Sequence, residues 1–191
     1  MQDNVPSTAG MPAASEPARQ LGANRFQTVA SLAGVIGHPG FPAGDRAALR
    51  RMRPGETWPP AFWRILMDRV PEVERRSDEA ERTWASIMQS MAIMAPHVHA
   101  PGARLGSVLA SVGGNPMEHR LLQLLRLSGS RLEDAVRLLA RRLAGLDQPV
   151  DWRDMASLLL LDPATDPGES ARRRIARDFY AWRRHQSNTQ D

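Results

Sequence analysis

The chain has 191 residues, 42% of them hydrophobic, which is enough for a substantial core and predicts a globular protein. It contains no cysteine, which excludes a disulfide framework, a thiolate zinc site and a cysteine nucleophile. The net charge is +4, and all 25 basic residues are arginines, whose planar guanidinium binds phosphate through two parallel hydrogen bonds. Because a GC-rich genome also replaces lysine by arginine, we judge function from where the arginines stand.

The N-terminal segment is low in complexity. Residues 1–24 are rich in Pro, Ala, Ser and Gly without a repeating apolar face, which predicts a disordered tail. We assign this tail no function. A short helix is predicted over residues 25–36, and it ends before the turn signal His38-Pro39-Gly40.

The next predicted helix is strongly basic. Asp45 is a candidate cap for a helix over residues 46–52. The charges of this segment are Arg46, Arg50, Arg51 and Arg53. A solvated helix usually mixes both signs, so a basic-only segment indicates phosphate contact as much as it indicates a solvated face.

An aromatic helix follows. Pro60 suits the first position of a helix over residues 61–70, because its missing N–H has no partner to lose there. Phe62 and Trp63 are expected to pack in the core. Arg64, on the same helix, is most simply a surface residue.

An acidic run precedes a long methionine-rich helix. The run consists of Glu72, Glu74, Asp78, Glu79 and Glu81. Paired carboxylates can perform acid–base chemistry, but no cleft signal accompanies them, so a solvated face is expected. The helix over residues 79–95 carries a Trp and Met stripe that is typical of a core, with an adaptable partner surface as the alternative. His97 and His99 are too close together to share a helical face and have no third ligand nearby, so no metal site is predicted.

A helix over residues 105–110 and the Gly113-Gly114 pair lead into the centre of the chain. The first central helix begins after Asn115-Pro116, a capping residue followed by a favourable first position. Its leucines occupy more than one face, which predicts a helix placed between other helices. They are Leu121, Leu122, Leu124, Leu125 and Leu127.

The second central helix has separate apolar and basic faces. Ser130 and Glu133 form a predicted capping box at its start, and Gly145 and Pro149 mark its end. The predicted buried stripe is Leu132, Val136, Leu139, Leu143 and Leu146. The arginines of the opposite face and its flank are Arg137, Arg141 and Arg142.

Two further helices are predicted, over residues 151–161 and 169–184. In the last one, Ile175, Phe179 and Trp182 fall in one narrow arc and are expected to pack. The other arc holds Arg173, Arg177, Tyr180 and Arg184. Arginines around an aromatic ring are typical of a surface that follows a phosphate backbone, so we count Arg173, Arg177 and Arg184 as nucleic-acid-binding candidates; a solvated amphipathic helix is the alternative.

No strand pattern, glycine-rich phosphate loop, histidine–carboxylate metal spacing or serine elbow is found. The sequence therefore predicts an all-α fold of eight or nine short helices in two packed bundles, residues 25–113 and 114–186. We expect no enzymatic activity, no cofactor, no metal and no small-molecule substrate. No apolar run approaches the roughly 18 to 20 residues that span a bilayer, and no secretion signal is evident, so a cytoplasmic protein without membrane contact is expected.

Several segments, in this order and spacing, resemble the CasB family, the small subunit of the type I-E CRISPR surveillance complex called Cascade. They are Asp45-Arg-Ala-Ala-Leu-Arg-Arg51, Pro60-Ala-Phe-Trp-Arg64, Arg104-Leu-Gly-Ser-Val-Leu-Ala110, Glu118-His-Arg-Leu-Leu-Gln-Leu-Leu-Arg126, Leu139-Ala-Arg-Arg-Leu143 and Pro149-Val-Asp-Trp152. The resemblance covers about residues 25–182.

The resemblance implies a non-catalytic, all-helical subunit present in two copies along the belly of a crRNA-guided complex. It implies that a basic surface supports the crRNA–target hybrid and the displaced DNA strand during R-loop formation in antiviral defence, in contact with the other Cascade subunits. Base pairing reads the sequence in such complexes, so the protein need only hold the backbone. By matching positions, the implied nucleic-acid contacts are Arg50, Arg51, Arg64, Arg120, Arg126, Arg141 and Arg142.

The four arginines of the two central helices are expected to share one groove. Arg120, Arg126, Arg141 and Arg142 come from helices joined by a short turn, and an antiparallel pair brings their charged ends together. Two other functions compete. A helix-turn-helix regulator would use residues 131–146 for recognition, but Glu133 and Asp134 at its start repel phosphate. A helical scaffolding protein leaves the last helix's arginines unexplained.

Overall fold

The computed structural model describes residues 16–53 and 56–189, which form nine α-helices and one short 3-10 helix, with no strand among them. The helices are α1 Glu16–Gly37, α2 Ala43–Arg50, α3 Pro60–Arg69, η1 Glu72–Glu74, α4 Asp78–Met94, α5 Leu105–Val112, α6 Asn115–Arg126, α7 Gly129–Gly145, α8 Trp152–Leu160 and α9 Asp166–Thr189. The predicted all-α fold is confirmed. None of these helices combines the length and apolar character needed to cross a membrane.

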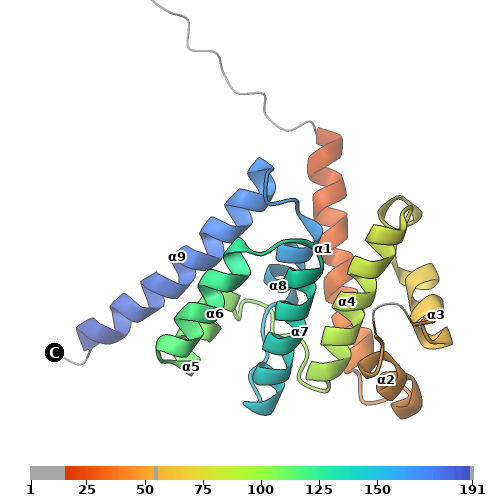
Figure 1. Ribbon diagram of the computed structural model, residues 1–191, viewed down its shortest axis with the longest axis horizontal. Helices are drawn as coiled ribbons and strands as arrows, with labels where there is room; N and C mark the ends of the chain where they lie inside the picture. The colour runs from red at the N-terminus through yellow and green to blue at the C-terminus, as the bar shows by residue number, and fades with distance from the viewer. Residues whose placement is uncertain (1–15, 54–55, 190–191) are drawn as a thin grey trace, which may run out of the picture.

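The helices share one hydrophobic core that runs from α1 to α9. In Figure 1, α9 lies along one side of the molecule next to α5 and α6, while α2 and α3 form the opposite end. Between them, α4 packs on α7, and α1 packs on α4 and α8. The largest helix contact joins α5 to α9, so the packing crosses the predicted division at Gly113.

Gly106 makes the α5–α9 contact possible. A Cβ atom at this position would lie 2.1 Å from the carbonyl oxygen of Ile175 and 2.7 Å from the backbone nitrogen of Phe179. Both distances are below van der Waals contact, and both neighbours are backbone atoms that cannot swing away. The two helix backbones therefore approach each other as closely as only glycine allows.

The N-terminal helix is longer than predicted. It begins at Glu16, so the expectation of a disordered tail is wrong for residues 16–24, and the rest of that prediction, residues 1–15, lies outside the described residues. Most of the added residues have high helix propensity, and Pro17 suits a first turn. The absence of an apolar face was misleading, because residues of high helix propensity extend this helix without one.

Three predicted caps are wrong. Helix α2 begins at Ala43, so Asp45 lies within its first turn. Helix α6 has Gly114 at its N-cap position in place of Asn115. Helix α7 has Ser128 at its N-cap, so Ser130 and Glu133 form no capping box. Gly129 has a φ of +55°, which lets the chain reverse direction two residues earlier than the predicted cap.

The buried faces follow the sequence pattern closely. In α7, the predicted stripe is buried except for Leu146, which follows the end of the helix and is 37% exposed. In α6, Leu121 and Leu124 are buried while Leu122 is 36% exposed, so this helix contacts α5 and α7 but keeps one face at the surface. In α9, Ile175 and Phe179 are buried as predicted.

Candidate nucleic-acid interface

Five arginines from two distant parts of the sequence line one groove, which we call the arginine groove. Arg50, Arg51 and Arg53 come from the end of α2 and the residues after it, while Arg137 and Arg141 come from α7. The groove has a volume of about 740 Å³. Its other lining residues are Met52, Glu56, Gln89, Asp134 and Leu138. Five guanidinium groups against two carboxylates make this hollow basic.

Gln89 of α4 holds the two walls of the groove together. This side chain is 5% exposed, and its Nε2 donates to the carbonyl oxygens of Arg50, at 3.2 Å, and Met52, at 2.5 Å. Its Oε1 accepts a hydrogen bond of 3.5 Å from Arg137 Nη1. The role of Gln89 could not be predicted from the sequence, because a polar position on an apolar helix gives no indication of partners about forty residues away.

Three of the groove arginines have partners within the protein. Arg50 donates to the carbonyl oxygens of Ala92 and Ala95 at the end of α4, which satisfies acceptors that a helix end leaves free. Arg137 pairs with Asp134 one turn earlier in α7. Arg53 lies 3.7 Å from Glu56. These three residues shape the groove and contribute positive potential.

Arg51 and Arg141 are different, because they are exposed and have no hydrogen-bond or ion-pair partner among the described residues. They stand on the two walls of the groove, one beyond the end of α2 and one on α7. An unpaired guanidinium keeps all its N–H donors available for phosphate oxygens. The groove therefore presents free donors from both sides.

The structure does not bring the four arginines of the central helices together. Arg126 ends α6 beside the joint with α7, whereas Arg141 lies twelve residues into α7, about 18 Å along the axis at 1.5 Å per residue. Figure 1 shows the two helices antiparallel, with α6 running toward that joint and α7 running away from it. Arg120 and Arg142 are exposed but do not line the groove. The predicted common groove is therefore wrong, and only Arg141 of this set enters the one observed.

Arg64 also lies outside the groove. Its guanidinium pairs with Asp45 at 2.8 Å and joins α3 to α2. This contact gives the side chain of Asp45 a partner on α3 in place of the predicted helix cap.

The arginine arc of α9 is partly neutralised. Arg173 pairs with Glu169 at 2.5 Å, and the two line a shallow hollow with Arg177. The hydroxyl of Tyr180 donates to Glu118 of α6 at 2.9 Å, and this hydrogen bond raises the pKa of the tyrosine. Arg177 and Arg184 are exposed and have no partner among the described residues, so each remains a candidate on its own.

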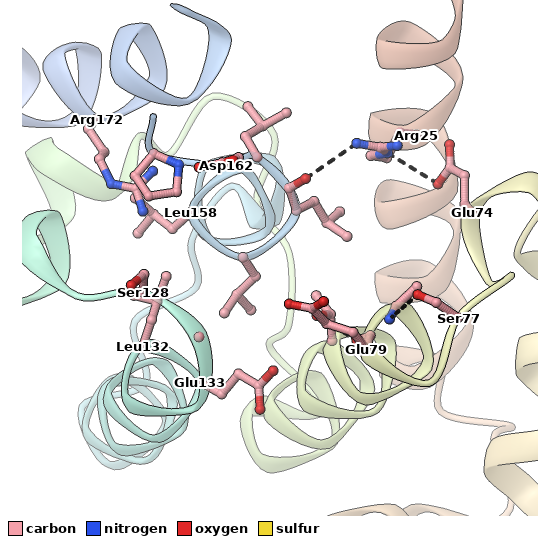
Figure 2. A pocket seen from close by; sticks show the side chains of 17 residues that line it. Arg25, Glu74, Ser77, Glu79, Ser128, Leu132, Glu133, Leu158, Asp162 and Arg172 are labelled. Atoms are coloured by element: carbon pink, nitrogen blue, oxygen red, sulfur yellow. Dashed lines mark hydrogen bonds and ion pairs between the residues drawn. The ribbon is translucent and has the colours of Figure 1, made fainter. Parts of the chain in front are cut away.

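A mixed-charge hollow between α1, α4, α7 and α8 is shown in Figure 2. Arg25 of α1 donates to the carbonyl oxygen of Leu160 at 3.3 Å and lies 3.4 Å from Glu74. Glu74 is 7% exposed, so the expectation of a solvated acidic run is wrong at this residue; burial raises its pKa, and Arg25 offsets part of the rise. Arg172, 8% exposed, donates to the Leu127 carbonyl oxygen at 3.4 Å. Arg25 therefore joins α1 to the end of α8, and Arg172 joins α9 to the end of α6.

The comparisons with known proteins concern the same region. The sequence model of the CRISPR-associated protein Cse2 matches residues 45–180, which include both walls of the arginine groove. The chain belongs to the Cse2 family. The crystal structure of CasB from Thermobifida fusca is similar, with a TM-score of 0.57 and 20% identity over 84% of this chain and 97% of that chain. No curated protein matches the chain.

The family match confirms the resemblance to CasB that the sequence motifs indicated. At 20% identity the solved structure shows only that the two proteins share a fold. The assignment to the family rests on the match to the sequence model. Membership of the Cse2 family supports a subunit of a CRISPR Cascade complex.

Proposed function

We propose that this Cse2-family chain is a non-catalytic small subunit that supports the crRNA–target hybrid and the displaced DNA strand during R-loop formation. In this proposal the arginine groove binds the phosphate backbone. The observation that carries it is the pair of unpaired guanidinium groups, Arg51 and Arg141, on opposite walls of a basic hollow. Binding through phosphates is independent of sequence, which suits a complex whose guide reads the sequence by base pairing.

The proposal places the chain with other Cascade subunits and with a second copy of itself, as the family resemblance implies, and in the cytoplasm. The remaining arginine candidates, Arg64, Arg120, Arg126 and Arg142 among them, stay predictions. A helix-turn-helix regulator is less well supported. Its recognition helix would be α7, which packs along α4 and buries Leu132, Val136, Leu139 and Leu143, and Asp134 stands at the end that should approach bases.

The test is the affinity of a reconstituted complex for target DNA. We expect the double variant Arg51→Ala/Arg141→Ala to assemble normally and keep its helicity, because neither guanidinium has a hydrogen-bond or ion-pair partner among the described residues, while target binding weakens. The matched control is Arg76→Ala/Arg131→Ala, which removes two exposed arginines outside the groove that have no ion-pair partner in the described part of the chain. Equal affinity of wild type and the groove variant would refute the proposal.

A further inference from the structure

A second hollow adjoins the arginine groove, and we call it the tryptophan pocket. Trp58 and Trp63 line it, and its volume is about 390 Å³, within the range of about 300 to 1,000 Å³ typical of small-ligand sites. The residues common to the pocket and the groove are Met52, Arg53, Glu56, Gln89 and Arg137. A ligand in one hollow is therefore next to a ligand in the other.

The two hollows differ in charge. The tryptophan pocket is lined by four carboxylates and three arginines, against two carboxylates and five arginines in the groove. Its carboxylates are Glu56, Asp78, Glu81 and Glu133, and its arginines are Arg53, Arg82 and Arg137. Four carboxylates disfavour a phosphate, and three guanidinium groups disfavour a cation. A neutral group that both donates and accepts hydrogen bonds fits this lining best.

The aromatic wall consists of two indole rings inclined to each other by 47° and packed on Phe62. The rings of Trp58 and Trp63 are half-buried, with their centroids 5.5 Å apart. Phe62, which is fully buried, packs edge-on against both, at 4.7 Å from Trp58 and 5.2 Å from Trp63. Side chains fixed in this way lose little freedom on binding, and an indole face stacks well on another planar ring.

Ser86 adds an unsatisfied polar group to the lining. This residue of α4 is 6% exposed, and its hydroxyl has no hydrogen-bond partner among the described residues. A buried hydroxyl without a partner is unfavourable, so a ligand that supplies one is stabilised. The carboxylates at the same site can accept hydrogen bonds from the exocyclic amino groups of bases.

We infer that the tryptophan pocket takes one unstacked nucleobase of the strand whose backbone lies in the arginine groove. The inference rests on the proposed function and deepens it. A base is covalently attached to the backbone that the groove holds, so two abutting hollows, one basic and one aromatic with balanced charge, match the two parts of a nucleotide. A side chain of a partner protein is the competing occupant, but the arginines of the lining and the adjoining basic groove favour a nucleotide.

The experiment measures binding of the full-length chain to two single-stranded DNAs of equal length. One has ordinary bases and the other is abasic throughout, so both carry the same phosphates. We expect wild type to bind the ordinary strand more tightly. Trp58→Leu and Trp63→Leu, which keep apolar bulk without a ring, should each weaken that binding about 5- to 150-fold, the equivalent of the ~1 to 3 kcal/mol typical of base–aromatic stacking. Binding of the abasic strand should not change.

Two controls keep the result interpretable. Trp182→Leu removes a half-buried tryptophan of α9 that does not line the pocket, and should affect neither strand. Ser86→Ala removes the unpaired hydroxyl without touching the aromatic cluster, and should weaken only the ordinary strand even if a tryptophan variant fails to fold.

Two results would overturn the inference. Equal wild-type affinity for both strands, or unchanged binding of the ordinary strand by well-folded tryptophan variants, would each exclude a base in the pocket. In each case loss of binding in Arg51→Ala/Arg141→Ala would still uphold the proposed function. If neither strand binds wild type, both proposals fail.

Discussion

Helices α7 and α9 carry similar sequence patterns, yet they present their arginines in different settings. Each has a buried apolar stripe and a basic face. In α7, Arg141 faces the basic end of α2 across a groove. In α9, Arg177 lies in a shallow hollow lined only by residues of its own helix, two of which, Asp166 and Glu169, are acidic.

The difference between the two helices lies in the elements beside them: a basic face on one helix lines a basic groove only where a second basic element packs opposite it. The spacing of arginines on α7 and α9 is set by the helix and can be read from the sequence. The groove beside α7 depends on the position of α2, which Gln89 fixes through backbone carbonyls. The hollow that holds Arg177 is lined by residues of α9 alone. We therefore expect α7 to contribute more to phosphate binding than α9.

The largest expected effect separates the two faces of α7. Leu139 is 2% exposed, and its neighbour Leu138 is 63% exposed. Leu139→Ala should lower the free energy of unfolding by about 2 to 5 kcal/mol, because it leaves a cavity in the core. Leu138→Ala, the same change one residue earlier, should have little effect. Denaturant unfolding measures both, and similar losses would contradict the observed orientation of α7.

A smaller loss is expected where α9 is anchored. Gly106→Ala introduces a methyl group between the backbones of α5 and α9, and overpacking of this kind costs about 1 to 3 kcal/mol. Gly34→Ala is the matched control, because a Cβ atom there meets nothing within 4 Å and alanine favours the helix. Thermal unfolding should show a lower melting temperature for the first variant and an unchanged or higher one for the second.

Acid should weaken the contact between the start of α8 and the residues just before α5. Asp151 caps α8 and also accepts from the backbone nitrogen of Gly102, just before α5. Burial raises the pKa of this carboxyl, but hydrogen bonds from Arg153 and from the backbone outweigh burial and lower the pKa to about 2. Because the folded-state pKa lies below the ordinary value of 3.8, the stabilisation is present above about pH 4 and is lost as the pH falls toward 2.

The ionised carboxylate of Asp151 should therefore contribute about 2 kcal/mol to the free energy of unfolding, since one pKa unit corresponds to about 1.4 kcal/mol. Asp151→Asn should therefore be less stable than wild type at neutral pH, and the difference should shrink between pH 4 and pH 2. Urea unfolding of both proteins across this range measures it. A constant difference would show that the charge of Asp151 contributes nothing.

The positions of the helices could be predicted from the sequence far better than the arginine groove. Apolar periodicity located the helices, because burial of one face decides helix position regardless of distant contacts. The first residues of the helices were less predictable. The positive φ of Gly129 accompanies a start of α7 before the predicted cap at Ser130, and the helix propensity of the residues around Pro17 extends α1 toward the N-terminus. The groove could not be predicted, because it depends on Gln89 and on a contact between α2 and α4. Trp63 was interpreted as packing, which describes only its buried side.

The salt dependence of nucleic-acid binding tests the central claim most directly. The isolated chain should bind single-stranded DNA without sequence preference, and its affinity should fall steeply between about 50 and 200 mM salt as counterions are released. For two lost phosphate contacts, Arg51→Ala/Arg141→Ala should lower the slope of log K against log salt by about 1.4. Arg177→Ala/Arg184→Ala, on α9, should leave the slope close to that of wild type. Equal slopes for wild type and the groove variant, or a larger change for the α9 variant, would contradict the assignment of the arginine groove as the backbone-binding surface.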